Sequence, residues 1–273
     1  MRKRTNHRVG HTGLRRAPGD RQFVGALHRG LEILRCFRAD DGPLGNQELA
    51  QRTGFPKATV SRLTYTLSKL GYLVYLPDEG KYRIGVPVLG LGFACLGGMK
   101  IRETMQPHMQ EIADYAGDGA LVALGGRDDL SMIYIGCARS VGVISLTLNV
   151  GSRISLGRSS MGRAYLAGLD EAEREELMEQ LRVHYGDDRW EPIRKGIHRA
   201  IAQIRDQGYC MHIGDWHPHV NSIAVPVRHP QPGMETCAMN IGGPSYVLTP
   251  ERLRTLGPRL VEVVQRVLSL TNA

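Results

Sequence analysis

The chain has 273 residues, of which 42% are hydrophobic, a composition typical of a globular protein long enough for two domains. No run of about eighteen apolar residues is present, and the basic N-terminus lacks the apolar segment of a signal peptide. We therefore expect a cytoplasmic protein without a membrane partner. The five cysteines form no C-x-x-C pair, and their odd number argues against a disulfide framework, so we expect buried thiols.

Positive charge is concentrated in the first 100 residues. They contain 17 Lys or Arg and 7 Asp or Glu, whereas residues 101–273 contain 18 and 20, so the net charges are +10 and −2. The basic part favours a polyanionic partner that is bound through phosphate contacts. Residues 1–22 hold seven basic residues without periodicity and are predicted to form a disordered basic arm. Such an arm either enters a minor groove or only solubilises the chain.

Three helices are predicted in residues 23–70. The first covers about residues 25–37, and the second begins at Asn46 and ends at Gly54, where glycine can adopt the positive φ that ends a helix. Pro56 suits the start of the third helix. The apolar stripe of this helix consists of Val60, Leu63, Leu67 and Leu70. The second and third helices predict a helix-turn-helix, a pattern that ordinary helical hairpins also show.

The opposite face of the third helix is polar, in the position where a recognition helix meets base edges and phosphates. Thr64 lies on this predicted face, and we assign DNA contacts to Lys57, Ala58, Thr59, Ser61, Arg62 and Tyr65. Two short strands follow, at about residues 72–76 and 81–84, around a Pro-Asp-Glu-Gly turn. They predict a wing, in which Lys81 and Arg83 alternate on one face and reach the phosphate backbone. Residues 23–85 are thus predicted to be a winged helix-turn-helix domain.

Residues 86–100 are almost entirely apolar or glycine and are too few to span a membrane. We expect a linker helix that is buried against the second domain or a second subunit. In residues 101–273, helices are predicted at about 101–115, 161–167, 171–181, 193–207 and 249–270, with Thr249 as the cap of the last. Strands are predicted at 120–124, 132–138, 143–148, 209–213, 222–227 and 236–241, with a loop at 149–160. This order indicates an α+β ligand-binding domain with a central antiparallel sheet.

Ten short motifs, in order along the chain, resemble the isocitrate lyase regulator (IclR) family of bacterial transcription factors. The motifs are Gly30–Leu34, Gln47–Ala50, Phe55–Leu63, Gly71–Leu73, Tyr82–Gly85, Gly151–Arg153, Gly162–Ala167, Gly208-Tyr209, Ile223–Val227 and Gly243-Pro244. The resemblance implies a winged helix-turn-helix joined by a linker helix to a GAF-like effector-binding domain. It also implies a homodimer or a dimer of dimers that binds double-stranded operator DNA, as a repressor or an activator.

The resemblance places an effector pocket between the sheet and the loop before the Gly-x-Ala helix. The matching positions are Val143, Leu146, Ile154, Ser160, Met161, His212, Ser222, Asn240 and Gly242. Ser160 and Met161 would open a helix, where free N–H groups favour an anion such as a carboxylate. We therefore expect a small organic or aromatic acid as the effector.

Other chemistries were weighed against this interpretation. His212, His217 and His219 with Asp215 have a spacing that zinc could use, but we favour a loop that closes over a ligand through Trp216. Gly157–Met161 lacks the second glycine of a nucleophile elbow, and Arg163-Ala164 replaces the Lys-Ser/Thr pair of a phosphate-binding loop. We expect neither an enzyme nor a cofactor. The alternative hypothesis is a small-molecule sensor or enzyme that carries a helical oligomerisation module and has no DNA function.

Overall fold

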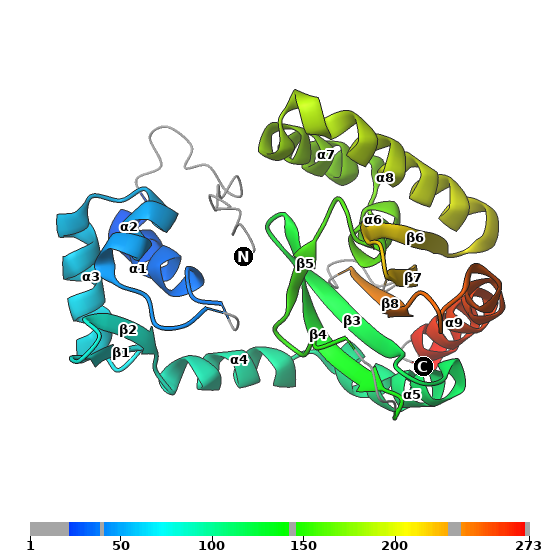
Figure 1. The fold of residues 1–273 in the computed structure, drawn as a ribbon, viewed down its shortest axis with the longest axis horizontal. Coiled ribbons are helices and arrows are strands. Elements are labelled where there is room, and N and C mark those ends of the chain that lie inside the picture. Colours follow the sequence, from blue (N-terminus) through cyan, green and yellow to red (C-terminus); the bar gives the residue numbers. More distant parts are fainter. Residues whose placement is uncertain (1–21, 39–40, 142–145, 229–235, 271–273) are drawn as a thin grey trace. The chain divides into compact units, whose positions relative to one another are not determined.

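The computed structural model describes residues 22–38, 41–141, 146–228 and 236–270. The chain forms two compact units, residues 1–98 and 99–273 (Figure 1). Almost all of the predicted basic arm, residues 1–22, lies outside the described residues.

Three helices and a hairpin form the first unit. The helices are α1 (Gly25–Arg35), α2 (Asn46–Thr53) and α3 (Lys57–Lys69), and the hairpin consists of β1 (Leu73–Leu76) and β2 (Lys81–Ile84). Ile33, Leu49, Val60 and Leu73 are each at most 1% exposed and meet in the core between these elements. Gly54 ends α2 with a φ of 73°, as its position predicted. The winged helix-turn-helix predicted from the sequence is confirmed.

The faces of α3 differ from the prediction at two residues. Thr64, which was predicted on the polar face, is fully buried, and Leu70, which was predicted in the apolar stripe, is 61% exposed. Thr64 follows Val60 by four residues and so lies on the same face of the helix. Its hydroxyl group is satisfied in the interior, because it donates to Val60 O and to Asn46 Oδ1, at 3.0 and 3.1 Å.

The linker helix is α4 (Pro87–Gly97), and none of its residues is buried. Leu89, Leu91 and Phe93 are 57 to 64% exposed. The first unit therefore leaves most of the apolar surface of α4 exposed, and the burial of this helix against the second domain or a second subunit stays a prediction. Cys95 on α4 is likewise exposed, against the expectation of buried thiols, whereas Cys36, Cys210 and Cys237 are buried and Cys137 is partly buried.

The second unit is built on a six-stranded antiparallel sheet with the order β5-β4-β3-β8-β7-β6. The strands are β3 (Leu121–Asp128), β4 (Ser131–Arg139), β5 (Arg153–Ser155), β6 (Cys210–His217), β7 (Val220–Val227) and β8 (Cys237–Pro244). The predicted central antiparallel sheet is confirmed. Of the strand predicted at 143–148, residues 143–145 lie outside the described residues and residues 146–148 are not in a strand. The edge of β4 is instead paired with β5, in the segment predicted as a loop.

Helices cover both faces of this sheet (Figure 1). On one face lie α6 (Ser160–Gly168), α7 (Glu171–Tyr185) and α8 (Asp187–Gln207), and on the other lie α5 (Lys100–Ala116) and α9 (Pro250–Leu270). Because side chains alternate along a strand, Ala224 and Asn240 face α6, while Ile223 and Ile241 face the α5–α9 layer. Helix α8 begins at Asp187, earlier than the predicted 193, and the added turns bury Trp190.

Candidate DNA-binding surface and effector cavity

The outer face of α3 presents the residues assigned to DNA contact. Lys57, Ala58, Ser61, Arg62 and Tyr65 are exposed, and Thr59 is partly buried. Lys57, Ser61 and Tyr65 follow one another at steps of four residues, and Ala58 and Arg62 are also four apart, so these five form two adjacent rows on one side of the helix. Within the part of the chain that the structure describes, the cationic groups of Lys57 and Arg62 have neither a hydrogen bond nor an ion pair. These two cations are therefore available to a phosphate or a base edge.

Side-chain hydrogen bonds fix α3 against α2. The Nδ2 atom of Asn46 donates to Ser61 Oγ at 3.2 Å, and its Oδ1 atom accepts from Thr64. Asn46 opens α2 and is partly buried. One side chain at the start of the first helix thus orients both the exposed and the buried face of the second.

The remaining part of α2 is held by charged groups. Arg52 donates to Cys36 O at 2.8 Å and pairs with Asp41, and this hydrogen-bonded pair lowers the pKa of Asp41. At the other end, Glu48 accepts from the N–H of Gly45 at 2.8 Å. The two ends of α2 are therefore both anchored to the chain that precedes it.

The two basic residues of the wing differ in their surroundings. Lys81 Nζ lies 3.8 Å from Glu48 Oε2 and is 38% exposed, so it leans toward the start of α2. Arg83 is exposed and donates to Ile84 O at 3.3 Å. The alternation of strand residues predicted one common face for Lys81 and Arg83, but only Arg83 is free of a carboxylate among the described contacts.

A cavity of about 320 Å³, including its open mouth, lies in the second unit on the α6 side of the sheet. The lining residues are Tyr134, Leu146, Leu148, Ile154, Ser159, Ser160, Trp216, Val220, Ser222, Asn240 and Gly242. Apolar side chains thus form most of the wall, and the polar groups come from the start of α6 and from strands β7 and β8.

The start of α6 is the polar end of the cavity. The Oγ atom of Ser159 accepts from the N–H of Gly162 at 3.0 Å, and the N–H of Arg163 bonds to Ser159 O at 3.1 Å. The first N–H groups of a helix have no carbonyl acceptor within the helix. Gly162 and Arg163 make the two bonds just described, whereas the N–H groups of Ser160 and Met161 make neither. The hydroxyl of Ser222 donates to Ser160 Oγ at 2.8 Å, next to these amides.

Asn240 and Gly242 lie on the floor of the cavity. They belong to the same face of β8, two residues apart. A Cβ atom at Gly242 would lie 3.6 Å from Asn240 Nδ2 and 3.7 Å from both Leu146 Cδ1 and Ser222 Cβ, so glycine leaves this space open. Among the described residues, Asn240 Oδ1 is buried without a hydrogen-bond partner. Burial raises the pKa of the neighbouring Tyr134, so its hydroxyl is neutral.

Six of the nine predicted effector positions line this cavity: Leu146, Ile154, Ser160, Ser222, Asn240 and Gly242. Val143 lies outside the described residues. Met161 and His212 do not line the cavity, contrary to the prediction. Met161 is fully buried in the core, where a Cβ atom at Gly125 would lie 2.3 Å from its sulfur atom. His212 is 2% exposed and is held by a buried arginine.

The structure adds lining residues that the prediction of the pocket lacked: Tyr134, Leu148, Ser159, Trp216 and Val220. Ser159 has a sequence signal, because a serine directly before a helix is a typical N-cap. Trp216 is the residue that was expected to close a loop over a ligand, and it is 37% exposed at the cavity wall. The positions of Tyr134 and Val220 depend on strand register, which one sequence alone does not give, and Leu148 lies outside the strands.

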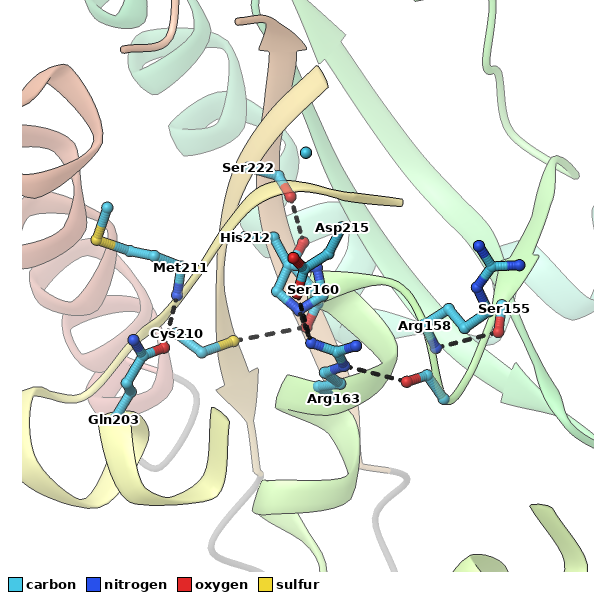
Figure 2. Close-up of polar contacts among 12 residues, drawn as sticks. Ser155, Arg158, Ser160, Arg163, Gln203, Cys210, Met211, His212, Asp215 and Ser222 are labelled. Carbon is cyan, nitrogen blue, oxygen red and sulfur yellow. Dashed lines mark hydrogen bonds and ion pairs between the residues drawn. The ribbon is translucent and has the colours of Figure 1, made fainter. Parts of the chain in front are cut away.

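Arg163, for which no role in the pocket was predicted, lies in the first turn of α6. Its guanidinium group contacts His212 Nε2 at 2.7 Å and donates to Asp215 Oδ2 at 3.0 Å (Figure 2). Burial, and then the charge of Arg163, lowers the pKa of His212 to about 3. His212 is therefore neutral, and its Nε2 atom accepts the hydrogen bond.

The proposed zinc spacing does not come together. Within the described ranges, no three His, Cys, Asp or Glu side chains form a group that could hold a metal ion. His212 is buried against Arg163, whereas His217 and His219 are exposed, with ring centroids 5.7 Å apart. Along the same part of the chain, no helix is long and apolar enough to cross a membrane.

Comparison with known proteins gives the same two-part division. Residues 26–77 match the IclR helix-turn-helix domain, and residues 93–268 match the family described as bacterial transcriptional regulator IclR, C-terminal. The HTH-type transcriptional regulator TsaQ1/TsaQ2 of Comamonas testosteroni is 34% identical over 248 residues, which cover 90% of this chain and 87% of that protein.

Two solved structures share the fold. The crystal structure of an IclR family transcriptional regulator from Brucella abortus is 46% identical, covers 92% of this chain and 94% of its own, and has a TM-score of 0.83. An IclR homolog from Microbacterium hydrocarbonoxydans, complexed with 4-hydroxybenzoate, has 20% identity and a TM-score of 0.63, and covers 88% of this chain and 99% of its own. The helix-turn-helix surface and the separate domain with a cavity are the two parts of a ligand-responsive regulator, and the chain belongs to the IclR family of bacterial transcriptional regulators.

Proposed function

We propose that this regulator reads operator DNA with α3 and that a small aromatic or other organic acid, bound in the cavity, controls the binding. The observation that carries the proposal of an acid is the start of α6. Ser159 and Ser160 of this segment line the cavity beside the hydroxyl of Ser222, and the N–H groups of Ser160 and Met161 have no partner within the helix. A helix N-terminus favours negative charge. The apolar wall favours a compact hydrocarbon body on the same ligand.

On the DNA side, α3 enters the major groove. Arg62 and Lys57 supply the free cationic groups, Ser61 and Thr59 supply hydroxyls, and Tyr65 and Ala58 supply apolar contact to bases or sugars. Arg83 of the wing reaches a phosphate. Lys81 does so only after it leaves Glu48, and this costs little because both side chains are about 40% exposed.

We further propose a homodimer, or a dimer of two such dimers. The first unit has two exposed apolar surfaces, whose contact with water is unfavourable. On α1, Leu27 and Leu31 are 62% and 50% exposed, and on α4, Leu89 and Phe93 are 59% and 64% exposed. A second copy of this unit, related by a two-fold axis, can cover these surfaces with the same surfaces of its own. Such a dimer presents two copies of α3 to two half-sites of DNA, and the acid shifts the population of arrangements that match the half-site spacing.

The same reasoning places the protein in the cytoplasm, beside the promoters it controls, and assigns it no catalytic step. The Sγ atom of Cys210 lies 3.7 Å from the carbonyl oxygen of Ser160, at the start of α6. Burial raises the pKa of Cys210 to about 12, so this thiol stays protonated and is a poor nucleophile.

A ligand titration tests whether the cavity binds an acid. 4-Hydroxybenzoate, the acid bound by the Microbacterium protein, is compared with its uncharged amide in a thermal-shift series. The acid is expected to raise the melting temperature with concentration and the amide is not, because only the acid carries the charge that the start of α6 favours.

A matched pair of glycine variants locates the binding. Gly242→Ala fills the cavity floor without a clash, since all contacts of the added Cβ are 3.6 Å or longer. Gly126→Ala, on β3, meets only Ile135 at 3.9 Å and lies outside the cavity. The first variant is expected to lose the shift and the second to keep it. Equal shifts with acid and amide, or an unchanged shift in Gly242→Ala, contradict the proposed site.

A further inference from the structure

A buried arginine connects two elements that border the cavity. Arg163 belongs to α6, and its side chain is 7% exposed. Its Nε atom donates to Gly157 O at 3.1 Å, and its Nη1 atom reaches His212 and Asp215 on β6 (Figure 2). The guanidinium group thus holds the loop before α6, the helix itself and the end of β6 together.

The neighbouring helix leaves room for this group. Gly196 lies inside α8, and a Cβ atom at this position would come within 2.4 Å of Arg163 Cζ. Glycine weakens a helix interior, so its presence here is explained by the guanidinium packed against it. His212 contributes no charge, because it is neutral. Asp215 is therefore the carboxylate that balances the charge of Arg163, while Arg199 of α8 acts on the same pair with a further positive charge.

Strand β6 departs from regular pairing at this place. Its register with β7 shifts between Ile213 and His217, and Gly214 has a φ of 68°. The N–H of Gly214 bonds to Asn221 Oδ1 at 3.1 Å instead of continuing the ladder. The irregular segment contains Asp215, which contacts α6, and Trp216, which lines the cavity. These two are neighbours in sequence, so the position of one constrains the other.

We propose that Arg163 and Asp215 are positioning residues for the effector: their ion pair holds the irregular end of β6 against α6 and thereby places Trp216 in the cavity wall. Neither residue lines the cavity, so the pair acts through Trp216. The proposal rests on the proposed function in one respect, that an acid occupies the cavity. The position of Trp216 without a ligand is independent of it.

Fluorescence of Trp216 tests the placement directly. The chain has two tryptophans, so Trp190→Phe leaves Trp216 as the single emitter. In this background, quenching by acrylamide is measured without ligand, and affinity is measured with 4-hydroxybenzoate. Asp215→Asn is expected to raise the quenching constant. It is also expected to weaken the binding of 4-hydroxybenzoate by about tenfold, or about 1.4 kcal/mol. Asp215→Glu, which keeps the charge, is expected to restore much of both values.

The matched control is Asp187→Asn, since Asp187 is 82% exposed and pairs with Arg182 on the surface of the same unit. It is expected to change neither readout. Unchanged quenching in Asp215→Asn overturns the proposal, with or without a loss of affinity, because the pair would then not place Trp216. If the parent protein binds no acid but Asp215→Asn still raises the quenching, the positioning role stands and the proposed effector fails. If Asp215→Glu behaves like Asp215→Asn, the ion pair is not the cause.

Discussion

Asn46 Oδ1 accepts a hydrogen bond from the buried hydroxyl of Thr64 at 3.1 Å, and this contact joins the first residue of α2 to the middle of α3. The angle between the two helices decides how α3 meets DNA. A polar pair that was not expected in the core therefore supports the presentation of the exposed face.

Replacing Asn46 should destabilise the DNA-binding unit. Asn46→Ala removes a donor to Ser61 and an acceptor for Thr64, which still bonds to Val60 O. We expect a loss of about 1–2 kcal/mol in the free energy of unfolding, measured by urea denaturation. Gln47→Ala is the control, because Gln47 is exposed at the next position of the same helix. Equal effects of the two changes would show that the bridge adds nothing.

Arg62 is predicted to read a base. Arg62→Ala should weaken binding to operator DNA by about 1–3 kcal/mol if its guanidinium contacts a guanine. Arg62→Lys keeps the charge and loses the bidentate geometry, so it should lose specificity for the operator over competitor DNA while it retains the salt dependence. Fluorescence anisotropy at two salt concentrations measures both. Wild-type specific affinity in Arg62→Ala at physiological salt would rule out the assignment.

His212 should make the second unit lose stability in mild acid. Its pKa is about 3 in the folded chain and 6.5 as the unperturbed value, so the unfolded state binds the proton first as the pH falls. The folded chain is therefore destabilised progressively from about pH 6.5 down to about pH 3, by about 2 kcal/mol at pH 5.

A His212→Gln variant should reduce this pH dependence between pH 7 and 5, in denaturation curves recorded at each pH. His217→Gln, at an exposed position of the same strand, should retain it. A His212 variant with the same slope as the parent would mean that His212 titrates normally.

The apolar surface of α4 is predicted to hold the dimer together. Phe93→Asp places a charge where 64% of an aromatic side chain is exposed in the single chain, and Val183→Asp does the same at an exposed valine of α7. Analytical ultracentrifugation should show a shift toward monomer for the first variant only, because burying an unpaired carboxylate in an interface is costly. A dimer that persists in Phe93→Asp would place the interface elsewhere.

Local signals explain which parts could be predicted. Gly54, the apolar spacing after Lys57, and the turn between Leu76 and Lys81 each specify structure within a few residues, so the helix-turn-helix and its wing are where the sequence placed them. Thr64 is buried because local bonds such as the one to Val60 O satisfy its hydroxyl, whereas Leu70, which directly follows the last residue of α3, is exposed.

The cavity was only partly predictable because it depends on contacts between distant segments. Strand β5 has three residues, too few for a periodic signal, and its pairing with β4 sets the wall at Ile154. The environment of His212 depends on Arg163, which lies 49 residues away in the sequence. The exposure of α4 could not be predicted from its composition. An apolar composition indicates that a segment is buried in the assembled protein, but it does not say whether the same chain or another chain buries it.

The central claim is that an acid in the cavity of one unit changes the affinity of the other unit for DNA. The most direct test is the ratio of operator Kd values with and without saturating 4-hydroxybenzoate, measured on the promoter fragment beside the protein's own gene. The predicted result is a change of about 5- to 150-fold for the parent protein and none for Gly242→Ala. Thermal stabilisation by the acid together with an unchanged operator Kd in the parent protein would contradict the account.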